Sequence, residues 1–180
     1  MKNPAQRVGV FIDVQNLYYS AKALYGAKVN FGEILKTAVA DRQLVRAIAY
    51  TIKAQMPEEQ NFFDALTNMG IEVKSKELQV FVSGVKKGDW DVGIAVDILK
   101  MAPKLDAIIL CSGDGDFEML LAHAKAEGVR AEVISFGRST SGRLLEEVDD
   151  FVDLDQDPER FLIKGRTAPK TSQKKKRLFG

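Results

Sequence analysis

Two aspartates follow an apolar run in the middle of the chain, within Ser112-Gly113-Asp114-Gly115-Asp116-Phe117. The apolar run 107–110 before them is typical of a buried strand, and residues 118–127 after them are typical of a helix. In an open parallel sheet, ligands bind at the carboxyl ends of the strands, where such strand-to-helix turns lie. Carboxylates at this turn, with glycines that allow a close backbone approach, therefore predict a ligand site.

Two more aspartates are expected at the same edge of the sheet. Asp13 ends the apolar run 8–12, which indicates a strand buried on both faces, and Asp91 begins a predicted helix before the run at 107–110. Two carboxylates about 4 Å apart repel by roughly 4 kcal/mol at an effective dielectric constant near 20, so several cannot all stay ionised in one cleft. Either some are protonated, or a divalent cation binds; an all-oxygen site suits Mg²⁺ or Mn²⁺.

Asp97 fits this cluster less well. It follows Asp91 by six residues, and this spacing in an α-helix is a rotation of roughly 240°, so the two cannot share one helix face. Any single aspartate can also simply cap a helix or remain solvated, as Asp91 or Asp116 could. We therefore expect Asp91 and Asp97 to have unequal roles.

Strands and helices alternate along the whole chain. Apolar runs predict strands at 8–12 and 107–110, and further strands are predicted at 45–52, 71–77 and 130–136, with a short one near Phe151. Helices are predicted at 17–25, 31–39, 91–101 and 118–127, with one starting near Pro57 and one through Leu144 and Leu145. Residues 80–85 indicate a short hairpin or a loop. Alternating strands and helices imply right-handed crossovers. We expect an α/β fold, a three-layer α/β/α sandwich around a mainly parallel sheet of about five strands.

Composition limits the class of protein. With 46% hydrophobic and 28% charged residues, the 180-residue chain is ordinary for one globular domain. No apolar stretch approaches the roughly 20 residues needed to span a bilayer, so no membrane partner is expected. The single cysteine, Cys111, excludes a disulfide within the chain and favours a cytoplasmic location.

The charge of the chain is unevenly distributed. Seven of the 26 basic residues lie in 164–180, which has no acidic residue, so residues 1–163 carry 19 basic and 25 acidic residues, a net charge of −6. We expect one acidic domain, 1–163, followed by a basic and disordered tail, 164–180. The tail is either a solvated extension or a source of salt-dependent attraction to a phosphate backbone.

Several other chemistries are excluded by residue counts. An EF-hand starting at Asp114 would need Gly at position six and Glu at position twelve, where the chain has Met119 and Lys125. Neither a Walker A loop nor GxGxxG after the first predicted strand is present. His123 is the only histidine and lies within a predicted helix, so a zinc site or a Ser-His-Asp triad lacks ligands or partners.

Four motifs in order resemble the NYN domain, and most closely its LabA-like bacterial branch within the PIN-like nuclease superfamily. They are residues 11–16, residues 87–97, residues 112–117, and Phe136-Gly137 followed by Ser141 and Leu144-Leu145. The resemblance covers residues 7–155 and leaves out the tail. It implies a PIN-like, Rossmann-like α/β/α sandwich, with metal-dependent ribonuclease activity in at least some members.

The resemblance also implies roles for individual residues. Asp13 and Asp114 match central metal-binding carboxylates, and Asp91 and Asp116 complete the catalytic cluster, with Asp97 as a further matching metal position. Asn16 and Ser112 match polar positions that orient substrate or metal-bound water, and Ser141 matches a further position for contact with substrate. No acidic position of the motifs is substituted in this chain.

The leading hypothesis is a Mg²⁺- or Mn²⁺-dependent ribonuclease acting on single-stranded RNA. An acidic pocket repels RNA, so nearby positive charge is needed, and Lys86, Lys87, Arg138 and Arg143 are candidates at the same edge. The alternative is a non-catalytic RNA- or protein-binding regulator with the same fold. A phosphatase of small phosphate esters is disfavoured because the first predicted strand lacks Asp-x-Asp. A homodimer is expected from the resemblance, because PIN-like relatives often self-associate.

Overall fold

The computed structural model describes residues 2–53, 59–77, 79–80, 86–87 and 89–163. The predicted basic tail at 164–180 lies outside these residues, as do Pro57 and all but the first residue of the segment 80–85. Within the described residues, none of the helices has both the length and the apolar character required to cross a membrane.

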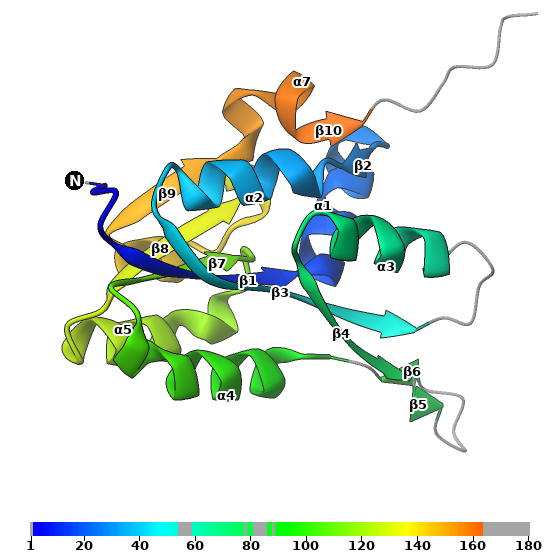
Figure 1. Ribbon diagram of the computed structural model, residues 1–180. Coiled ribbons are helices and arrows are strands. Elements are labelled where there is room, and N and C mark those ends of the chain that lie inside the picture. Colours follow the sequence, from blue (N-terminus) through cyan, green and yellow to red (C-terminus); the bar gives the residue numbers. More distant parts are fainter. Residues whose placement is uncertain (1, 54–58, 78, 81–85, 88, 164–180) are drawn as a thin grey trace, which may run out of the picture.

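Six strands form the central sheet, in the order β4-β3-β1-β7-β8-β9 (Figure 1). Every pairing in it is parallel. The strands are β1 (Arg7–Asp13), β3 (Gln43–Lys53), β4 (Glu72–Glu77), β7 (Ala107–Cys111), β8 (Arg130–Ser135) and β9 (Asp150–Asp153). The predicted α/β fold with a mainly parallel sheet is confirmed, with six strands rather than about five because the short segment at Phe151 pairs with β8.

Seven α-helices lie in the described residues, and two of the predicted ones have the expected bounds. They are α1 (Val14–Tyr25), α2 (Phe31–Val39), α3 (Glu59–Asn68), α4 (Asp91–Met101), α5 (Glu118–Ala126), α6 (Gly142–Glu146) and α7 (Pro158–Phe161). Helix α1 begins three residues earlier than predicted, because the Asp13 carboxylate caps its first turn by accepting from the Asn16 N–H.

Short elements complete the described part of the chain. The antiparallel pairs are β2 (Lys28–Val29) with β10 (Leu162–Ile163), and β5 (Gln79–Val80) with β6 (Lys86–Lys87). Four 3₁₀ turns are η1 (Ala102–Lys104), η2 (Gly115–Phe117), η3 (Gly137–Ser139) and η4 (Leu154–Gln156).

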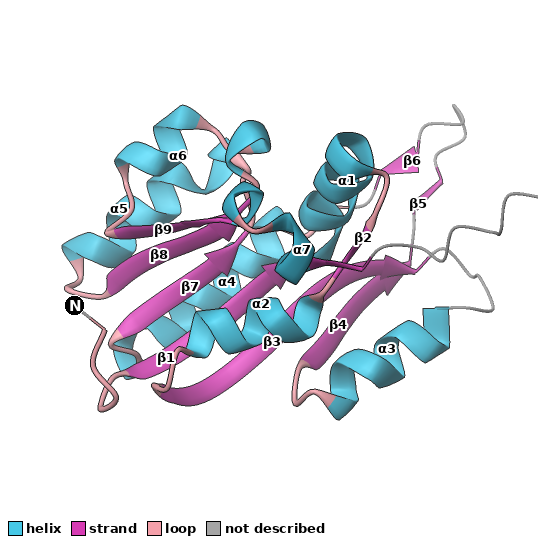
Figure 2. Ribbon diagram, turned by 90° about the horizontal axis from the view of Figure 1, so that it is seen from above, coloured by secondary structure: helices cyan, strands magenta, loops and turns pink. Residues whose placement is uncertain are grey.

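Successive residues of the buried strands serve opposite faces of the sheet, which makes three layers. Val10 and Ile12 of β1 pack in a core with α1, α2, α3 and α7, while Phe11 between them packs in a second core with α4, α5 and α6. Seen from above, α1, α2, α3 and α7 lie over the near face and α4 behind the strands (Figure 2). Such double-sided burial explains why these strands read as continuous apolar runs.

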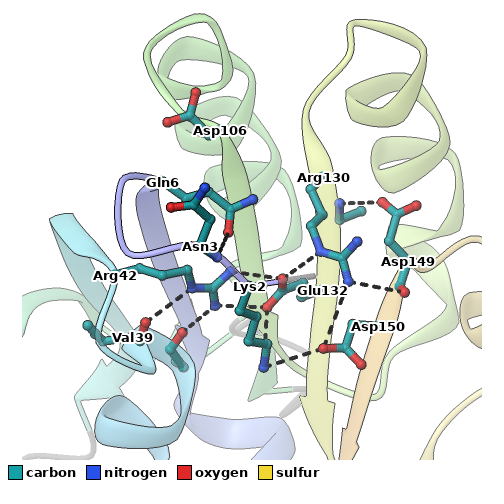
Figure 3. Close-up of polar contacts among 12 residues, drawn as sticks. Lys2, Asn3, Gln6, Val39, Arg42, Asp106, Arg130, Glu132, Asp149 and Asp150 are labelled. Atoms are coloured by element: carbon teal, nitrogen blue, oxygen red, sulfur yellow. Dashed lines mark hydrogen bonds and ion pairs between the residues drawn. The ribbon is translucent and has the colours of Figure 1, made fainter.

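A buried ionic network joins elements near the amino ends of the strands (Figure 3). Glu132 of β8 accepts two hydrogen bonds of 2.9 Å from Arg42 and one of 2.8 Å from Arg130. Arg42 also donates to the carbonyls of Ala38 and Val39 at the end of α2. Arg42 and Glu132 are both buried, so loss of either side chain would leave a buried charge without its partner. It lies at the opposite end of the sheet from the aspartates of the predicted site.

Candidate metal centre

The strand order places the predicted site at a topological switch point. From β1 the chain first adds β3 and β4 on one side, and then returns to add β7, β8 and β9 on the other. The strand order therefore reverses between β1 and β7, and in open α/β sheets the carboxyl ends of the strands at such a reversal are the usual position of a ligand. Ile12 pairs with Cys111 there, so Asp13 and Ser112, the next residue of each chain segment, emerge at the same edge.

Three carboxylates meet at this edge. Asp91, Asp114 and Asp116 each offer one oxygen, and these oxygens lie within 4.8 Å of one another. Asp91 is the first residue of α4, Asp114 caps the 3₁₀ turn η2, and Asp116 lies within that turn. The N–H of Asp116 donates to Asp114 Oδ1 at 3.0 Å, which fixes the turn that carries both. We call these three residues the carboxylate trio.

Asp13 adjoins the trio without belonging to it. Its side chain is only 8% exposed, and it accepts hydrogen bonds from the Asn16 N–H at 3.0 Å and from Ser112 Oγ at 3.2 Å. Burial raises the pKa of Asp13, against the effect of these hydrogen bonds, and the charge of Asp114 raises it further. Asp13 therefore adds negative charge to the centre while its oxygens hold the surrounding backbone.

The electrostatics of the centre are unfavourable without a cation. Partial burial, followed by the charges of Asp114, Asp13, Asp89 and Asp116, raises the pKa of Asp91 to about 6. Burial and the nearby carboxylates both disfavour the charged form of Asp91, so its ionisation is shifted toward neutral pH. The donor set fits Mg²⁺ or Mn²⁺: the trio supplies only hard carboxylate oxygens, and a divalent ion would compensate their charge.

The polar residues of the first and third motifs shape the loop after β7. Gly113 donates its N–H to Asn16 Oδ1 at 2.9 Å, and Asp114 donates its N–H to Ser112 Oγ at 3.3 Å. A Cβ on Gly113 would lie 2.7 Å from Ser135 Oγ and 3.0 Å from a backbone oxygen, so glycine is required by the packing. Both residues were expected to orient substrate or metal-bound water, and both also bind Asp13: Asn16 holds the backbone of Gly113, and Ser112 holds the backbone of Asp114.

Ser141 lies against the same loop from the other side. It donates its N–H to the carbonyl of Gly113 at 3.0 Å, and a Cβ on Gly115 would lie 2.7 Å from its Oγ. Two residues on, Arg143 is exposed on α6. The structure thus brings Ser141 to the trio's loop and leaves Arg143 on the surface of the helix that follows.

Two other predicted residues, Asp97 and Arg138, pair with groups outside the trio, and two predicted lysines have side chains outside the described residues. Asp97 accepts from Tyr50 Oη and from Lys74 Nζ and lies outside the trio. Arg138 forms an ion pair of 3.1 Å with Asp155, and its guanidinium lies over the Tyr25 ring. The side chains of Lys86 and Lys87 lie outside the described part of the chain, although their backbone forms β6.

Sequence reasoning missed the aromatic side chains near these carboxylates. Trp90, the only tryptophan, directly precedes Asp91 and packs 5.3 Å from the ring of Tyr50. Tyr18 and Tyr19 are 41% and 60% exposed on α1, which begins immediately after Asp13. Two features of the sequence could have indicated these residues. Trp90 directly precedes a motif aspartate, and both tyrosines lie outside the set of apolar residues that forms the buried face of α1.

Comparisons with known proteins identify relatives over most of the chain. Residues 7–155 match the NYN domain. The chain is 29% identical over 157 residues to the low amplitude and bright protein LabA of Synechococcus elongatus, covering 82% of this chain and 83% of that protein. It is also similar to the crystal structure of a protein of unknown function from Vibrio parahaemolyticus, with a TM-score of 0.82 and 32% identity over 91% of this chain and 99% of the other.

The matched region contains β1, α4, the loop after β7 and η3, which carry the four motifs. The resemblance inferred from those motifs is confirmed, and the shared fold extends to the solved relative. The chain therefore belongs to the NYN domain family, a family of PIN-like nucleases.

Proposed function

We propose that this protein is a Mg²⁺- or Mn²⁺-dependent ribonuclease whose ion is held by Asp91, Asp114 and Asp116. The observation that carries the proposal is the convergence of these carboxylates within 4.8 Å at the switch point of a PIN-like nuclease fold. A divalent ion there would polarise the scissile phosphate and lower the pKa of a bound water. No histidine or cysteine is needed for such chemistry.

The remaining residues of the centre would keep the trio in place. Asp13 is fixed by Asn16 and Ser112, and it adds a negative charge that favours a cation over a neutral site. The tight packing at Gly113 holds the loop against β8, so Asp114 and Asp116 have a rigid support. Rigid placement of the ligands is what in-line hydrolysis of a phosphodiester requires. The products expected are a 5′-phosphate and a 3′-hydroxyl.

Single-stranded RNA is the proposed substrate because two exposed aromatic side chains lie in the first turns of α1, the helix that Asp13 caps. Tyr18 and Tyr19 lie within about 9 Å of Asp13 along the axis of α1, and Lys22 Nζ is 5.8 Å from the Tyr18 ring. Unpaired bases stack on such rings, whereas a duplex does not offer its base faces. Arg143 and the basic segment 164–180 are proposed to attract the phosphate backbone. Arg138 is better explained by its pairing with Asp155.

The proposal includes a cytoplasmic location. Support comes from Cys111, the only cysteine, which is buried as a free thiol in β7 and needs no oxidising compartment.

The test is cleavage of end-labelled single-stranded RNA with Mn²⁺, with Mg²⁺ and with EDTA. We expect cleavage with either ion, none with EDTA, and a loss of at least about 100-fold in Asp114→Asn. Asp106→Asn is the matched control, because it removes a carboxylate at the opposite end of the sheet, where Asp106 pairs with Arg7. Equal cleavage by the wild type and Asp114→Asn would indicate a contaminant and refute the proposal. RNA binding without cleavage would favour a regulatory protein instead.

A further inference from the structure

Asp97 connects helix α4 to the two strands beside it. Its Oδ2 accepts from Tyr50 Oη of β3 at 2.8 Å and from Lys74 Nζ of β4 at 2.6 Å. The Asp97 side chain is mostly buried, and the Lys74 side chain is partly buried. A metal ion bound by Asp97 would have to compete with this ammonium group, and Asp97 lies six residues along the helix from Asp91.

Trp90 holds the start of the same helix to the same strand. Its indole Nε1 donates to the carbonyl of Thr51 in β3 at 2.7 Å. The ring occupies the space left by Gly93, where a Cβ would lie 2.5 Å from an indole carbon. Lys76 of β4 covers the indole, with its Nζ 4.1 Å from the ring. The position of the indole is thus determined by a hydrogen bond, a glycine and a cation.

Tyr50 joins these two attachments. Its side chain is fully buried, its hydroxyl binds Asp97, and its ring lies 5.3 Å from the Trp90 ring at an interplanar angle of 59°. Burial, and then the hydrogen bond to Asp97, raises the pKa of Tyr50, so its hydroxyl remains a donor throughout the physiological range. A continuous set of contacts therefore runs from Asp97 through Tyr50 to Trp90.

From these contacts we infer that Asp97 is a positioning residue: through Tyr50 and Trp90 it fixes the first turn of α4, and thereby the Asp91 carboxylate relative to Asp114 and Asp116. Helix α4 is attached at its start by Trp90 and at its second turn by Asp97, about 10 Å further along the axis. Neither attachment uses the Asp91 carboxylate, one oxygen of which lies within 4.8 Å of oxygens of Asp114 and Asp116. The inference rests on the proposed metal site, for which Asp97 supplies support instead of a ligand.

The test compares Asp97→Ala, which removes the hydrogen-bond acceptor, with Asp97→Asn, which keeps the size of the side chain and one acceptor oxygen. Trp90 is the only tryptophan, so its emission and its quenching by acrylamide in EDTA report on this contact chain alone. Mn²⁺ affinity is measured separately from the electron paramagnetic resonance signal of free Mn²⁺. Tyr50→Phe removes only the hydroxyl, and Asp106→Asn serves as the control for loss of a distant ion pair.

We expect Asp97→Ala to make Trp90 more accessible to acrylamide and to weaken Mn²⁺ binding by about 10- to 100-fold, the usual cost of losing a residue that orients a ligand. Asp97→Asn should fall between Ala and the wild type in both measurements, and Tyr50→Phe should resemble Asp97→Asn. Asp106→Asn should change neither.

Loss of Mn²⁺ binding in Asp97→Ala with unchanged Trp90 quenching would make Asp97 a direct ligand and overturn the inference. Unchanged quenching together with unchanged affinity would overturn it as well. If the wild type binds no Mn²⁺, the proposed function fails. The quenching measured in EDTA still shows whether Asp97 fixes the position of Trp90.

Discussion

Replacing Asp91 with asparagine should stabilise the metal-free protein at neutral pH, although it removes a proposed metal ligand. The pKa of Asp91 is about 6 in the folded protein, against an ordinary value of 3.8. At about 1.4 kcal/mol per unit, this difference has an upper limit of about 3 kcal/mol of unfavourable free energy in the ionised centre. Asp91 is only partly buried, and solvent screening reduces the expected gain in Asp91→Asn to about 1 kcal/mol.

The gain should depend on pH with a definite sign. Between about pH 4 and pH 6, the folded protein keeps a proton on Asp91 that the unfolded chain has released, so the free energy of unfolding of the wild type falls as the pH rises. Asparagine has no such titration. The advantage of Asp91→Asn is therefore absent below the ordinary pKa of 3.8, grows through this window and is complete above about pH 6.

Thermal unfolding in EDTA measures this effect. At about pH 8 we expect Asp91→Asn to melt roughly 2–4 °C above the wild type, with a smaller gain at about pH 5. Asp106→Asn should melt below the wild type instead, because it loses the Arg7 ion pair that lowers the pKa of Asp106 to about 2. Adding Mn²⁺ should raise the wild-type melting temperature more than that of Asp91→Asn. A lower melting temperature of Asp91→Asn in EDTA, or a gain independent of pH, would refute this electrostatic reasoning.

Three further predictions concern other parts of the molecule. Mn²⁺ affinity should fall below about pH 6, by at most about tenfold per pH unit, because binding must displace the proton of Asp91; a titration with no pH dependence across this range would contradict the raised pKa. Gly115→Ala should lower the free energy of unfolding by about 1–3 kcal/mol because Ser141 lies close to the added methyl group. In a double-mutant cycle, adding Ser141→Gly should recover most of this loss. Additive effects of the two substitutions would show that the two side chains do not clash. Glu132→Ala should cost about 3–5 kcal/mol in denaturant unfolding, since it leaves Arg42 buried without its carboxylate, and a loss below about 1 kcal/mol would mean that water replaces the pair.

The sequence was sufficient to predict those features that depend on local pattern. The apolar runs at 8–12 and 107–110 predicted β1 and β7, because strands that are buried on both faces require continuous apolar residues. The position of Asp114 after a strand and of Asp91 at a helix start followed from the same patterns, since strand ends and helix starts share one edge of an α/β sheet. The rotation of roughly 240° between Asp91 and Asp97 also predicted that the two residues differ in role.

Features that depend on contacts distant in sequence were beyond reach. Arg138 was expected to contact substrate, yet it pairs with Asp155 in η4, a partner that only the folded chain brings near. The hydrogen bonds that Asp97 accepts from Tyr50 and Lys74 likewise depend on the register of β3 and β4, which places these two residues opposite each other. Side-chain pairing across strands is set by register, and register was not determined by the apolar pattern of either strand alone.

Crystals soaked in Mn²⁺ and measured at a wavelength where manganese scatters anomalously provide the most direct test of the metal centre. We expect one strong anomalous peak coordinated by carboxylate oxygens of Asp91, Asp114 and Asp116, with Asp97 still bound to Tyr50 and Lys74. A soaked crystal without a peak at the trio, or with its peak at Asp97, would contradict the proposed centre.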